Sequence, residues 1–83
     1  MIHYGPGTYR ILIECAANIC LSYKSDAVTE LAKGDLVTII EDKAMSEDFR
    51  IRGRLTNDTW ITLEYKKPWG GFKYAKKVVI YKH

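Results

Sequence analysis

The stretch RIRGRLTNDTWITLEY, residues 50–65, alternates side-chain character with a period of two on both sides of a polar turn. Successive side chains of a β-strand point to opposite faces, so this pattern predicts a hairpin with an apolar and a basic face. A three-residue turn over 56–58 keeps the apolar residues of both strands on one face. A two-residue turn would place Arg52 and Arg54 against apolar residues of the return strand, so we expect the longer turn.

The register that follows from this turn gives three arginines of the first strand a structural use. Arg54 can stack on Trp60 as a cation–π contact, and Arg50 can form a cross-strand ion pair with Glu64. The same arginines are also able to grip a phosphate backbone. The predicted pairs are Leu55 with Thr59, Gly53 with Ile61, Ile51 with Leu63, Arg54 with Trp60, Arg52 with Thr62 and Arg50 with Glu64.

The rest of the chain carries further strand patterns between turn signals. We expect strands at residues 8–14, 17–22, 36–41 and 72–82, whereas the pattern of residues 27–31 fits a helix or a strand. In the first of these, Tyr9, Ile11 and Ile13 share one face. Turns recur about every 8–12 residues, which is typical of a small all-β barrel or sandwich. A chain of 83 residues predicts one domain, with a lead-in loop over 1–7 and a core over 8–82.

A family resemblance rests on two stretches. VTELAKGDLVTIIED resembles the Src-homology-3 superfold where its first long loop passes into the second strand, and DFRIRGRL-TND-TWITLEY resembles that family's central strands. Bacterial-type members of the family show a similar element, Gly-Trp-Val, near these central strands. The resemblance covers about residues 8–79. It implies a small SH3-like barrel of five to six short antiparallel strands. It does not extend to proline-peptide recognition, because ECAAN replaces the tyrosine-rich loop and Thr62 replaces a proline.

Charge and aromatic residues gather toward the end of the chain. Residues 1–65 carry seven Lys or Arg and ten acidic residues, whereas residues 66–83 carry six lysines and no acid. Such a basic segment favours an anionic partner, or it is a solvated edge strand. The aromatic residues 60, 65, 69 and 72 among these lysines are typical of a protein interface, a single-stranded nucleic-acid site or the edge of a core. The candidate binding residues are Arg50, Arg52, Arg54, Trp60, Tyr65, Lys66, Lys67 and Trp69.

Several kinds of activity have no pattern in the sequence. We find no catalytic constellation, no phosphate loop and no compact Cys/His ligand set, so we expect neither an enzyme nor a metal or other cofactor. Cys15 and Cys20 are expected to be buried free thiols, with a disulfide or one reactive thiol as alternatives. The longest apolar run has four residues, where a membrane-spanning helix needs roughly 20.

The first residues lack a signal-peptide pattern, so we expect a cytoplasmic or otherwise intracellular protein. The preferred function is a non-catalytic module that binds another protein as an accessory or scaffold subunit. The alternative is a nucleic-acid-binding barrel that uses the same basic and aromatic surface.

Overall fold

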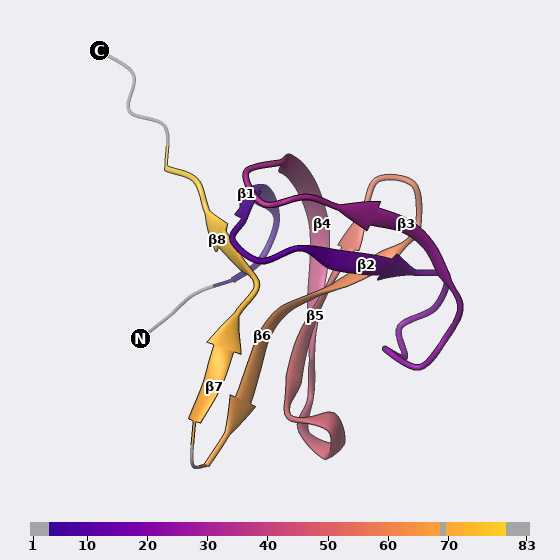
Figure 1. Cartoon of the computed structure of the whole chain (residues 1–83), viewed down its shortest axis with the longest axis vertical. Coiled ribbons are helices and arrows are strands. Elements are labelled where there is room, and N and C mark those ends of the chain that lie inside the picture. Colours follow the sequence, from indigo (N-terminus) through magenta and orange to yellow (C-terminus); the bar gives the residue numbers. More distant parts are fainter. Residues whose placement is uncertain (1–3, 69, 80–83) are drawn as a thin grey trace.

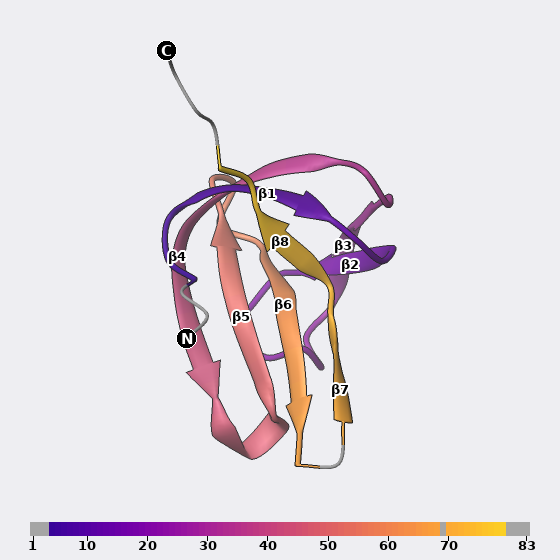
Figure 2. The same cartoon turned by 90° about the vertical axis from the view of Figure 1, so that its left-hand side faces the viewer.

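The computed structural model describes residues 4–68 and 70–79, which form one curled antiparallel sheet. The strand order is β3-β2-β6-β5-β4-β1-β8, and β7 pairs with β6. In Figures 1 and 2 this sheet bends into a half-barrel, in which β2 and β3 run across the long strands β4, β5 and β6. The elements are β1 (Gly7–Ile11), β2 (Cys15–Asn18), β3 (Ala27–Leu31), β4 (Leu36–Met45), the 3₁₀ turn η1 (Ser46–Asp48), β5 (Arg50–Leu55), β6 (Trp60–Lys67), β7 (Gly70–Lys73) and β8 (Ala75–Lys77).

The predicted all-β, barrel-like antiparallel fold is confirmed, with eight strands in the described residues where five or six were expected. Residues 27–31 form a strand, and the last extended segment divides in two at Tyr74. The Tyr74 backbone N–H donates to the Leu63 carbonyl on β6, and its carbonyl accepts from the Leu12 N–H beyond β1. At this residue the chain therefore changes its pairing partner, from β6 for β7 to β1 for β8.

Strand ends differ from the expected ones where a partner strand continues the pairing. β4 was expected to end at the acidic pair Glu41-Asp42. It continues to Met45 because β5 pairs with it as far as that residue. β2 lies earlier than predicted, since residues 19–26 form a loop closed by the Ile19 N–H bond to the Asp26 carbonyl. β1 ends at Ile11, so Ile13 is 41% exposed rather than on the buried face.

The β5–β6 hairpin has the predicted turn and four of the six predicted pairs. The Leu55 N–H donates to the Thr59 carbonyl at 2.7 Å, and the pairs of Gly53, Arg52 and Arg54 are those expected. Between Ile51 and Arg52 the register shifts, so that Ile51 pairs with Glu64 and Arg50 with Tyr65. The predicted pairs of Ile51 with Leu63 and Arg50 with Glu64 are therefore wrong. A β-bulge adds one residue to a strand, and alternation alone does not reveal it.

The hydrophobic core fills the concave side of the sheet. Burying one large apolar side chain in this core stabilises the fold by about 1.5–3 kcal/mol. Gly53 lies among these residues because a Cβ atom there would be 3.0 Å from Leu63 and 3.1 Å from Ile39. From the expected lead-in loop, Tyr4 packs against the core and stacks on Tyr9. The buried core residues are Tyr9, Ile11, Ala17, Ile39, Leu55, Ile61, Leu63 and Ala75.

The lysine-rich segment pairs within the sheet. β8 lies at one end of the strand order and pairs with β1, Lys76 opposite Arg10 and Lys77 opposite Tyr9. This agrees with the edge-strand interpretation, in which lysines discourage pairing with another chain. The expected strand reached residue 82, and residues 80–83 lie outside the described residues. The candidate binding residue Trp69 also lies outside them.

Candidate functional site: an arginine pocket

Arg52 is a buried cation held by neutral oxygen atoms. It was expected on the basic, solvent-exposed face of the hairpin. It is only 1% exposed, because β2 and the 19–26 loop cover that face of β5. Its Nε donates to the Leu21 carbonyl at 2.9 Å, and its Nη2 donates to Asn18 Oδ1 at 2.7 Å. It also donates to Thr62 Oγ1 and to the Trp60 carbonyl. The planar guanidinium thus joins β2, the loop, β5 and β6.

Arg50 lies next to this group and is enclosed by aromatic rings. Its guanidinium carbon is 4.1 Å from the centre of the Tyr23 ring and 4.8 Å from that of Tyr65. The bulge in β6 makes the second contact possible, because it places Tyr65 opposite Arg50. Arg50 Nη1 donates to Thr62 Oγ1 at 3.1 Å, whereas its buried Nε has no hydrogen-bond partner in the described part of the chain.

A pocket of about 260 Å³ opens over these two guanidinium groups. Its residues come from β2, the 19–26 loop, β5, β6 and the crossing at Tyr74, and none of them is a carboxylate. Burial and the charge of Arg50 lower the pKa of Arg52 to about 10, which leaves it charged at neutral pH. The nearby carboxylate of Asp48 acts in the opposite direction. The lining residues are Cys15, Ala16, Asn18, Tyr23, Arg50, Arg52, Thr62 and Tyr74.

The third arginine of the strand serves a different purpose. Arg54 lies opposite Trp60 as predicted, but its guanidinium binds two carboxylates, Glu41 at 2.8 Å and Asp58 at 2.7 Å. Hydrogen bonds to these carboxylates raise its pKa. Trp60 is only 8% exposed, which agrees with the edge-of-core alternative for this aromatic and removes it from the candidate binding surface. Glu64, the expected partner of Arg50, instead accepts a hydrogen bond from the Tyr4 hydroxyl.

A second hollow, mainly apolar, is also lined by Arg50. It has a volume of about 380 Å³ and lies beside η1. Phe49 is 42% exposed here and has a backbone φ of 56°, a left-handed conformation that is rare for a bulky residue. We call this hollow the Phe49 groove. Its lining residues are Ala44, Met45, Ser46, Phe49, Arg50, Ile51 and Lys66.

The structure therefore divides the predicted site residues. Arg50 and Arg52 meet in the pocket, and Arg50 and Lys66 meet in the Phe49 groove. The Tyr65 ring stacks on Arg50 and has the Lys67 ammonium 5.0 Å from its centre. Arg54 points to carboxylates outside both hollows.

Six pocket residues were not predicted as site residues: Cys15, Ala16, Asn18, Tyr23, Thr62 and Tyr74. Asn18, Tyr23, Thr62 and Tyr74 are distant in sequence and meet only through the strand order. The one signal for Tyr23 is an aromatic residue in a loop that is otherwise polar over residues 22–26. Thr62 was predicted to pair with Arg52 across the hairpin, but it was not predicted as a binding residue.

The remaining expectations concern thiols, metals and membranes. Cys15 is half-buried and Cys20 is exposed, both as free thiols, so the expectation that both are buried holds only in part. Within residues 4–68 and 70–79, no three His, Cys, Asp or Glu side chains are grouped to hold a metal ion. In that part of the chain no helix has the length and apolar character needed to cross a membrane.

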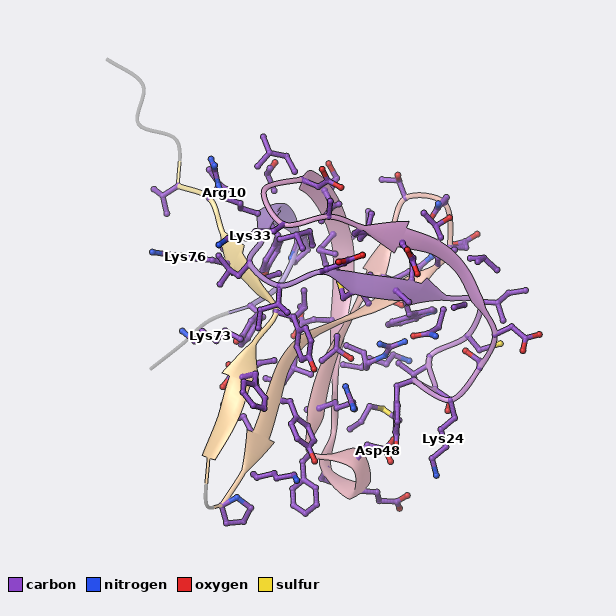
Figure 3. All side chains as sticks on the ribbon, viewed as in Figure 1. Arg10, Lys24, Lys33, Asp48, Lys73 and Lys76 are labelled. Atoms are coloured by element: carbon purple, nitrogen blue, oxygen red, sulfur yellow. The ribbon has the colours of Figure 1, made fainter. Side chains whose placement is uncertain are left out.

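Basic side chains follow one side of the half-barrel. Figure 3 labels Arg10, Lys33, Lys76 and Lys73 along the side formed by β8 and β7, away from Asp48 and Lys24. All four are exposed, and among the described residues none of them forms an ion pair. We call this set the β8 basic row.

Comparison with known proteins adds no family to this description: no protein-family model, curated protein or solved structure matches the chain. The Src-homology-3-like relationship stays a prediction.

Proposed function

We propose that this protein is a non-catalytic module that binds another protein inside the cell, as an accessory or scaffold subunit. The binding surface is the Phe49 groove with Arg50, Tyr65 and Lys66 at its border. This surface retains three of the residues predicted from the sequence and omits the buried Trp60 and the ion-paired Arg54.

The observation that carries the proposal is the exposure of Phe49 in a strained backbone conformation. A bulky L-residue in the left-handed region costs about 1–2 kcal/mol, and such strain gathers at functional sites. The core does not need this ring, because Phe49 is not among the residues that form or border it. An exposed aromatic beside an arginine is also the composition of a protein-binding hot spot.

The test is a selection of peptides from a random display library on the immobilised protein. We expect enriched peptides that bind with micromolar affinity and that lose at least about tenfold when Phe49 is changed to Ser, because the apolar anchor is removed. Leu36→Ser is the matched control, since Leu36 is 58% exposed at the start of β4 and outside the groove. Selection that yields no peptide, or peptides equally sensitive to both variants, would overturn the proposal.

A second candidate function, nucleic-acid binding, is favoured by the β8 basic row. Exposed cations that follow one edge suit a phosphate backbone, and such binding weakens steeply with salt. The test is a titration with a mixed-sequence single-stranded oligonucleotide at two salt concentrations. Binding that weakens with salt and disappears in Lys73→Glu/Lys76→Glu supports this candidate, whereas no binding at low salt rejects it.

A further inference from the structure

We propose that the pocket over Arg50 and Arg52 binds the carboxylate of an acidic side chain, presented by the partner segment that lies in the Phe49 groove. The inference rests on the proposed function and adds the chemistry of the partner. It begins with the charge of the pocket floor. Arg52 is almost fully buried, and among residues 4–68 and 70–79 it donates only to neutral oxygens, so these residues leave its positive charge without a counter-ion in direct contact. A buried charge of this kind is unfavourable unless an anion lies nearby.

The second guanidinium increases this imbalance. Arg50 and Arg52 donate to the same hydroxyl, Thr62 Oγ1, at 3.1 and 2.9 Å, so two like charges share one acceptor. The Arg50 guanidinium carbon lies 4.1 and 4.8 Å from the centres of the Tyr23 and Tyr65 rings, and its Nε is buried, so its Nη atoms are the donors that can serve a ligand. Thr62 accepts two bonds and still has its own proton to donate. The pocket therefore presents donors from three side chains and no carboxylate.

The charge balance favours a carboxylate over a phosphate. The two guanidinium charges are partly offset by Asp48, whose carboxylate acts on Arg52 from outside the pocket lining. What remains suits one negative charge better than the two of a phosphate monoester. The walls also fit an amino-acid side chain, because Ala16, Tyr23 and Tyr74 offer apolar surface around about 260 Å³. Guanidinium groups bind carboxylates in a planar, two-bonded geometry.

The position of Arg50 connects the pocket with the proposed binding surface. This one residue lines both the pocket and the Phe49 groove. A peptide whose apolar side chain lies against Phe49 can thus place a neighbouring acidic side chain at Arg50, in the pocket that Arg52 also lines. Arg54, with its own carboxylates, takes no part.

The test uses the arginine Nε–Hε NMR signals of the full chain. Three probes are added in turn: sodium benzoate, inorganic phosphate and a glutamate-containing peptide obtained in the selection above, compared with its Glu→Gln form. We expect benzoate to shift the signals of Arg50 and Arg52 but not that of Arg54. We expect the Gln peptide to bind about tenfold more weakly, as for the loss of one charge-assisted hydrogen bond.

The variants are Arg50→Gln and, as matched control on the same strand, Arg54→Gln. Arg50→Gln should weaken benzoate binding about tenfold, and Arg54→Gln should leave it unchanged. Arg50 is only partly buried, and its variant is first compared with the wild type by urea unfolding. Should Arg50→Gln not fold, Tyr23→Leu replaces it, since this change removes the ring that holds Arg50 and keeps an apolar wall.

The outcomes separate this inference from the proposed function. Shifts produced by phosphate at lower concentrations than by benzoate would overturn the carboxylate assignment. Equal binding of the Glu and Gln peptides would overturn use of the pocket and leave the groove proposal intact. Shifts by benzoate, when no peptide can be selected, would support a carboxylate site for a small free acid and overturn the protein partner.

Discussion

Replacing Arg52 by lysine tests whether the geometry of the guanidinium, rather than its charge, holds the β2 region to the sheet. The four oxygen acceptors of Arg52 lie in different directions around one planar group. A lysine ammonium keeps the charge but is a compact group, so we expect it to serve about two of them. The other two become buried acceptors without a partner, at about 1–3 kcal/mol each. The expected loss is therefore about 2–6 kcal/mol, a large part of the roughly 4–12 kcal/mol usual for a domain of this length.

The assay is urea unfolding followed by tryptophan fluorescence, in which Trp60 reports from beside the network. With a slope of about 1 kcal/mol per molar urea, the midpoint should fall by about 2 M or more. Arg54→Lys makes the same change two residues along β5, where the ion pairs are exposed to solvent and contribute little. Equal, small midpoint shifts for both variants would refute the reasoning, because they would mean that the four hydrogen bonds do not determine the stability.

Three further predictions concern other parts of the fold. Phe49→Gly should be more stable than Phe49→Ala by about 1 kcal/mol in urea unfolding, because only glycine adopts φ 56° without strain; the reverse order would contradict the left-handed backbone. Burial and a hydrogen bond to Glu64 raise the pKa of Tyr4, so the folded state holds this proton more tightly than the unfolded state. Stability should be complete below about pH 10 and fall as the pH rises above it, less steeply in Tyr4→Phe when unfolding midpoints are compared across this range. Burial also raises the pKa of Cys15, so a thiol-specific disulfide reagent should modify the exposed Cys20 first, and equal rates would argue against the burial of Cys15.

The sequence was sufficient for the strands whose faces differ in polarity. Alternation around residues 56–58 predicted the hairpin, its turn and the pairs nearest the turn, because a one-residue slip would move every apolar side chain to the wrong face. The same argument placed Tyr9 and Ile11 in the core. It could not reveal the bulge beside Ile51, since an extra residue changes the pairing without changing the composition of the strand.

The site was harder to predict because its burial depends on a distant element. Arg52 has the polarity of a solvent-facing residue, and only the path of β2 and the following loop shows that this face is covered. The burial of Trp60 depends on the same element, since Asn18 of β2 pairs with it. Arg50 contacts the rings of Tyr23 and Tyr65, which lie 27 and 15 residues away from it along the chain. No local sequence pattern connects residues at these distances.

The single backbone pair between β2 and β6, Asn18 with Trp60, has a consequence for how the molecule opens. A hairpin joined to a sheet at one position would ordinarily detach in small fluctuations, well before global unfolding. Here detachment of the hairpin also removes two hydrogen-bond acceptors from the charged Arg52, which donates to Asn18 and to the Leu21 carbonyl. The arginine thus couples the opening of the β2–β3 hairpin to that of the whole sheet. Backbone amides in β2 should exchange their hydrogens at the slow rate of cooperative unfolding, although β2 and β6 share one backbone pair.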